Sequence, residues 1–140
     1  MIAMGEAGAA CGHGAYAAAV RCPVVVACAQ FTNWPEQRHV GMGDMERALI
    51  HGEIDFKMLG RDKWPVENGL VILEWEGPWP PRARPCFRHW VAFREGMIWD
   101  SNLEEWKSRS EWEQFLPDLM PKRSTGWHIA RAYEVEPVNP

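Results

Sequence analysis

The hydrophobic pattern of this chain changes after Gly52, and that change limits the folds it can adopt. Before it, the segment 11–20 (CGHGAYAAAV) is rich in alanine, which favours helix beyond its glycines. Pro23 suits the first turn of a second helix. After the change, the apolar run 70–75 (LVILEW) is typical of a central strand. Helices followed by strands predict an α+β fold, with N-terminal helices packed on a mostly antiparallel sheet.

A β-hairpin is predicted in the middle of the second half. Residues 89–93 (HWVAF) form its first strand, Glu95-Gly96 the tight turn, and 97–99 (MIW) the returning strand.

The end of the chain predicts one more helix and one more strand. Ser110 and Glu113 have the spacing of a capping box, so a helix is expected to start there and to end before Pro117. The segment 126–135 (GWHIARAYEV) is expected to form the last strand.

Length and charge exclude several classes of protein. The chain has 140 residues, which fits one domain spanning 1–140. A net charge of −4 argues against a nucleic-acid partner, which usually demands a basic face. The longest apolar run, 23–29, is far shorter than the roughly 20 residues that cross a bilayer. The first ten residues carry no basic segment of a signal peptide, so we expect a cytoplasmic protein with no membrane partner.

Tryptophan and cysteine are the unusual residue types. The nine tryptophans are expected to pack the core and line a cleft, and a sugar- or base-stacking surface is the alternative. The four cysteines form no C-x-x-C pair, which argues against a zinc or dithiol centre. Three of them are expected to be small buried apolar residues, namely Cys22, Cys28 and Cys86.

Cys11 differs from the other cysteines because it opens a predicted helix and is followed by Gly12. A thiol there faces the positive end of the helix dipole and unpaired backbone N–H groups. Both favour the thiolate, the nucleophilic form of cysteine. The backbone N–H of Cys11 could also stabilise an oxyanion.

His89 and Asp100 are candidates for the partners of this thiol. His89 opens the first strand of the predicted hairpin, and Asp100 follows the returning strand. Because a hairpin brings its two ends together, the Asp100 carboxylate is expected to orient the His89 imidazole. Asn102 is a rival for this orienting role. Trp90 is expected to shield the pair from water, being next to His89.

The order and local contexts of these residues resemble the papain-like cysteine peptidases. The resemblance is nearest to the bacteriocin-leader (double-glycine) peptidases and related phage and bacterial peptidases. It lies in Cys11-Gly12, in the strand that begins His89-Trp90-Val91-Ala92, and in the turn Asp100-Ser101-Asn102, within residues 10–135. It implies a papain-like fold and a Cys-His-Asp triad formed by Cys11, His89 and Asp100.

The chain departs from that family at one position. The family places a glutamine six residues before the nucleophile, where its amide completes the oxyanion hole, but Gly5 stands here and Glu6 cannot donate when ionised. His13 or Gln30 could replace this donor. Alternatively, the true start of the chain lies further upstream, or the domain is a weakened or inactive enzyme.

The triad predicts a thiol hydrolase that cleaves peptide or isopeptide bonds through an acyl-enzyme, with a peptide or protein as substrate and no cofactor. Two alternatives stay open. A transglutaminase-like acyl transferase or deamidase would use the same three residues, and an inactive papain-like module would only bind.

Other candidate sites have weaker support. His89, Asp100 and His128 lack the spacing of a metal motif, so no metal is expected. Three arginines precede the first hairpin strand, namely Arg82, Arg84 and Arg88. They are expected either to lie in a solvated loop or to form a patch at the edge of the cleft that selects an acidic substrate segment.

Overall fold

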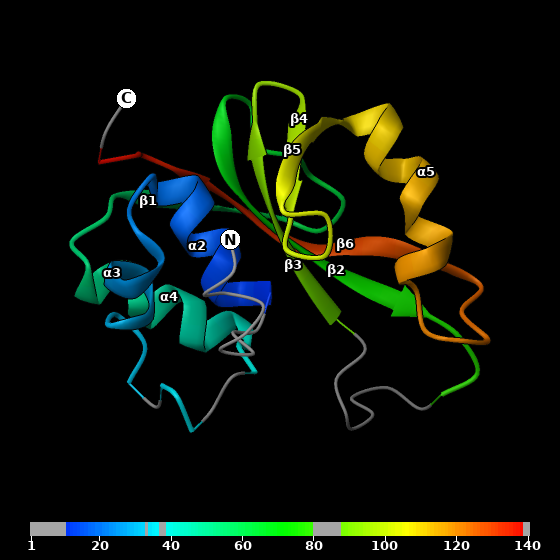
Figure 1. Ribbon diagram of the computed structural model, residues 1–140, viewed down its shortest axis with the longest axis horizontal. Coiled ribbons are helices and arrows are strands. Elements are labelled where there is room, and N and C mark those ends of the chain that lie inside the picture. Colours follow the sequence, from blue (N-terminus) through cyan, green and yellow to red (C-terminus); the bar gives the residue numbers. More distant parts are fainter. Residues whose placement is uncertain (1–10, 33, 37–38, 80–87, 139–140) are drawn as a thin grey trace.

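Within the described residues, three helices precede the sheet in the computed structural model of the chain (Figure 1). The structure describes residues 11–32, 34–36, 39–79 and 88–138. Helix α2 (Cys11–Val20) is buried along most of its length. Helix α3 (Val24–Cys28) begins after Pro23, and α4 (Met42–His51) ends at Gly52. The predictions of a helix over 11–20 and of a second one opened by Pro23 are confirmed.

The strands form one six-stranded sheet in the order β1-β6-β2-β3-β4-β5. Every pairing among them is antiparallel, which confirms the α+β class. The last strand, β6, lies between β1 and β2, so the end of the chain fills the interior of the sheet. The strands are β1 (Phe56–Leu59), β2 (Asn68–Glu76), β3 (Arg88–Arg94), β4 (Met97–Asp100), β5 (Glu105–Ser108) and β6 (Gly126–Val135).

The predicted hairpin is present as β3 and β4. Glu95 and Gly96 form its turn with φ angles of 46° and 84°, the left-handed values that a two-residue hairpin turn requires. Ala92 lies opposite Trp99, and the pairing continues to the turn. The end of β4 is thereby returned toward the start of β3.

Each face of the sheet carries its own core, because side chains alternate along a strand. One core lies between the sheet and helices α2 to α4 and includes Leu70 and Trp90. The other lies under helix α5 (Arg109–Leu119) and includes Val71 and Val91. Figure 1 shows α2, α3 and α4 grouped on one side of the strands and α5 on the other.

The tryptophans confirm the prediction of core packing. All nine belong to one of the two cores, four of them buried and the rest partly buried. The buried ones are Trp75, Trp90, Trp99 and Trp112.

Helix α5 differs from its prediction at both ends. Its cap is Ser108, whose hydroxyl accepts the Glu111 N–H at 3.2 Å, so the capping box lies two residues earlier than predicted. Pro117 lies inside the helix, which continues to Leu119. The buried side chains of Trp112 and Leu116 anchor α5 on the sheet, and this packing outweighs the hydrogen bond that the proline cannot make.

Candidate active site

Cys11 is the first residue of α2 and is partly buried. Its sulfur accepts the backbone N–H of Trp90 at 3.3 Å. The pairing of β3 with β4 reaches only Ala92, so Trp90 lies beyond the residues that pair with β4. The sulfur therefore lies beside β3, where it takes the place of a strand carbonyl.

Close packing fixes the start of α2 at this position. A Cβ atom added to Gly12 would lie 2.6 Å from the Cβ of Val40. The Val40 carbonyl also accepts the indole N–H of Trp90 at 2.7 Å. The small residue after the cysteine thus lets the segment around Val40 hold both the helix start and β3.

His89 is the second residue of β3 and is only 7% exposed. Its Nε2 is 2.9 Å from Oδ2 of Asp100. The ring N–H is poorly aligned with that oxygen, so the contact is mainly electrostatic. The ring of Trp75 stacks on the imidazole with centroids 6.0 Å apart and an interplanar angle of 19°.

Asp100 ends β4 and is completely buried. Two donors outside the histidine hold its carboxylate. The indole N–H of Trp112 donates to Oδ2 at 3.0 Å, and the backbone N–H of Asn102 donates to Oδ1 at 3.0 Å. A buried carboxylate with this many partners keeps one orientation toward the ring.

The charges of the three groups support one another. Burial alone would raise the pKa of the Cys11 thiol, but the charge and hydrogen bond of His89 and the Trp90 N–H outweigh it, so the pKa is lowered. Burial alone would lower the pKa of His89, but the Cys11 sulfur and the Asp100 carboxylate raise it. These shifts favour a thiolate facing an imidazolium.

Asp100 completes this charge arrangement. Burial alone would raise the pKa of its carboxyl, but the close contact with His89 and its charge, helped by the Asn102 N–H and the Trp112 indole, lower it. The carboxylate is therefore ionised beside the imidazolium and compensates its charge.

The other cysteines lie in a different setting. Burial raises the pKa of the thiols of Cys22 and Cys28. Both are free thiols, and Cys28 is buried in the helical layer. Their surroundings favour the unreactive thiol form.

The structure corrects the expectation for Trp90. Its side chain points to the opposite face of β3 from His89, where it stacks on Tyr133 with centroids 5.9 Å apart. The ring that covers the imidazole is Trp75, which sequence reasoning missed, as it missed the indole donor Trp112. Trp75 and His89 lie on the same face at neighbouring positions of β2 and β3, but only the strand register reveals it.

The remaining predicted residues have other contacts. The Asn102 side chain is not what orients His89, because its backbone N–H binds the Asp100 carboxylate, which faces the ring. His13 is fully buried and its ring packs on Phe31 at 4.3 Å. Gln30 donates to the Val26 carbonyl at 2.9 Å and contacts His51 at 2.7 Å, which ties α3 to the C-terminal end of α4.

Several sequence candidates lie outside the described residues, namely Gly5, Glu6, Arg82, Arg84 and Cys86. Arg88 is described, as the first residue of β3, where it pairs with Glu74 at 2.8 Å. His128 contacts Glu74 and Glu76, while His89 contacts Asp100. Within the described segments, no group of three or more His, Cys, Asp or Glu side chains could hold a metal ion.

Comparison with known proteins gives no match to a protein-family model, a curated protein or a solved structure. Among the helices of the described segments, none is long and apolar enough to span a bilayer. The arrangement of Cys11, His89 and Asp100 is thus the basis for any functional assignment.

Proposed function

We propose that the chain is a papain-like thiol hydrolase that cleaves peptide or isopeptide bonds. The observation that carries the proposal is the continuous line of contacts from the Cys11 sulfur through the His89 imidazole to the buried Asp100 carboxylate. A residue of α2 and two residues of the β3–β4 hairpin meet at one end of the sheet, and each changes the pKa of the next. Perturbed titratable groups in mutual contact are typical of catalytic sites.

In this proposal the Cys11 thiolate attacks the carbonyl carbon of the substrate. The backbone N–H of Cys11 stabilises the oxyanion, and the His89 imidazolium gives its proton to the leaving amine as the acyl-enzyme forms. The neutral imidazole then takes a proton from water, which attacks the acyl carbon and releases the acid and the thiolate. Asp100 orients the ring throughout.

The test is alkylation with iodoacetamide near pH 6, with the labelled site located by mass spectrometry. A thiolate at Cys11 should be labelled much faster than the thiols of Cys22 and Cys28, whose pKa values are raised. His89→Ala should slow the labelling of Cys11, while His51→Ala, at the exposed end of α4, should leave it unchanged. Equal and slow labelling of all cysteines would contradict the proposal.

A second assay identifies the acceptor of the acyl group. The protein is incubated with a peptide ester and a primary amine, and the products are separated. Free acid as the main product supports hydrolysis. Amide as the main product would replace hydrolysis with acyl transfer by the same three residues.

A further inference from the structure

A row of polar side chains crosses the sheet next to the candidate active site. Arg88 of β3 lies opposite Glu74 of β2, which in turn lies opposite His128 of β6. Arg88 is two residues before Trp90, whose N–H binds the Cys11 sulfur. Residues two apart on a strand share a face and are separated by about 7 Å. Arg88 therefore lies on the face of the sheet that carries α2, near the end of α2 that bears Cys11.

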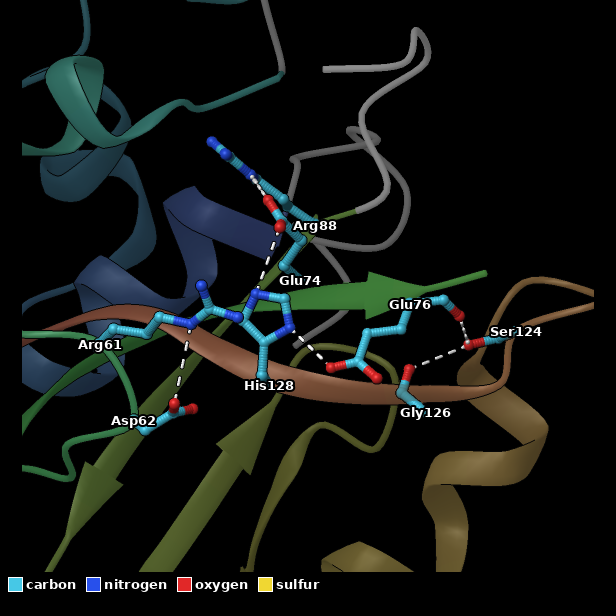
Figure 2. Close-up of polar contacts among 8 residues, drawn as sticks. All are labelled: Arg61, Asp62, Glu74, Glu76, Arg88, Ser124, Gly126 and His128. Carbon is cyan, nitrogen blue, oxygen red and sulfur yellow. Dashed lines mark hydrogen bonds and ion pairs between the residues drawn. The ribbon is translucent and has the colours of Figure 1, made fainter. Parts of the chain in front are cut away.

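The row is held together by one ion pair and by two contacts of the His128 ring with carboxylates. Nε of Arg88 is 2.8 Å from Oε2 of Glu74, and the other oxygen of Glu74 is 3.2 Å from Nε2 of His128. Nδ1 of His128 is 2.8 Å from Oε2 of Glu76. Figure 2 shows the four side chains in series, with the terminal nitrogens of Arg88 directed away from both carboxylates.

This arrangement uses only part of the Arg88 guanidinium. Within the described residues, Glu74 is its ion-pair partner and it contacts Arg88 through Nε. The side chain is 30% exposed. The terminal N–H groups of an arginine form a planar fork that matches a carboxylate. A guanidinium fixed at one edge and open at the other is prepared to bind an anion.

We propose that Arg88 binds a carboxylate group of the substrate. This carboxylate lies close to the carbonyl carbon that Cys11 attacks. The inference rests on the proposed function, because it places the carboxylate relative to the reacting carbonyl. A partly exposed ion pair such as Glu74–Arg88 contributes little to stability. We therefore assign it the role of orienting the terminal N–H groups of Arg88. The carboxylate belongs either to an acidic side chain or to the end of a peptide.

The test compares alkylating reagents that differ only in one carboxylate. Iodoacetyl-glycine is compared with its amide for a terminal carboxylate, and iodoacetyl-aspartate amide with iodoacetyl-asparagine amide for a side-chain carboxylate. We expect at least one carboxylate reagent to label Cys11 about tenfold faster than its neutral partner. The pair that shows the preference identifies the source of the carboxylate.

Arg88→Gln should abolish the preference without changing the rate of the neutral reagent, and Arg88→Glu should reverse it. Arg109→Gln is the matched control, because it removes the same charge from α5 on the opposite face of the sheet. Equal rates for both members of each pair, or a preference that survives Arg88→Gln, would overturn the inference alone. Slow labelling by the neutral reagents would overturn the proposed function and the inference with it.

Discussion

The two faces of the sheet contribute to the candidate site in different ways. The nucleophile comes from the helical face, where α2 is held by small residues in close contact, such as Gly12 against Val40. The base and the acid come from the face under α5, where Asp100 is held by an indole hydrogen bond and His89 by a stacked tryptophan. Steric fit therefore positions the start of the helix that carries the sulfur. A hydrogen bond and a stacked ring, both from tryptophans, position its partners.

Because of this difference, we expect different kinds of substitution to disrupt the two halves of the site. On the helical face, added volume should be damaging. On the face under α5, a lost donor or charge should be damaging, because a buried polar group without its partner is costly. Substitutions on each face, ordered by the size of the effect, test this contrast.

The largest effect is expected at the buried ion pair. Asp100→Ala leaves the imidazolium of His89 and the indole N–H of Trp112 without their acceptor, and should lower the free energy of unfolding by about 3–5 kcal/mol. Urea unfolding near pH 7 measures it. Glu105→Ala, which removes an exposed carboxylate on the next strand, should change it by less than about 0.5 kcal/mol.

The same comparison has a defined pH dependence. The pKa of Asp100 is lowered in the folded state, so its contribution is present above the pKa of an unfolded aspartate and is lost as pH falls through the folded pKa. The difference between the wild type and Asp100→Ala should therefore shrink in acid. A difference that grows on acidification would show that Asp100 is not ionised in the folded protein.

The second effect separates the cysteines of the helical layer. The alkylation rate of Cys11 should rise with pH through a midpoint below the ordinary value of 9.0, while the midpoint of Cys22 should lie above it. Each unit by which the pKa is lowered increases the thiolate fraction about tenfold at lower pH. His89→Ala should move the Cys11 midpoint upward. Coincident midpoints for the two cysteines would remove the contrast.

The third effect tests steric fit at the start of α2. Gly12→Ala places a methyl group against Val40 and should destabilise the protein by about 1–3 kcal/mol in urea unfolding. Adding Val40→Ala should restore part of the loss, because it makes room. Gly60→Ala is the matched control, since no atom lies within 4 Å of the added Cβ. Equal effects of the two glycine substitutions would mean that close packing does not hold α2.

Local patterns in the sequence predicted the parts of the fold that local interactions determine. The helix over 11–20 follows from alanine, the hairpin from Glu95-Gly96, and the last strand from its apolar alternation. The hairpin also predicted that Asp100 returns beside His89, and the two side chains are 2.9 Å apart. Such predictions succeed because the neighbours in space are set by a short turn.

The rest depends on tertiary contacts that no short pattern encodes. Two overlapping S-x-x-E patterns lie at the start of α5, and packing of Trp112 in the core selects the earlier one. Strand β5 was not predicted, because its residues are mostly partly exposed at an edge of the sheet and show no clear alternation. The indole that holds Asp100 comes from a different element, so only the docking of α5 brings it to the carboxylate.

The smallest effect isolates that indole. Trp112→Phe keeps an aromatic ring under α5 but removes the N–H that donates to Asp100. We expect a loss of about 1 kcal/mol in urea unfolding. We also expect a small upward shift in the pH midpoint of Cys11 alkylation, because a less firmly held carboxylate stabilises the His89 imidazolium less. Trp127→Phe changes a partly buried tryptophan of the same core and should leave that midpoint unchanged. A midpoint that moves equally in both variants would show that aromatic packing, and not the hydrogen bond to Asp100, couples this face to the sulfur.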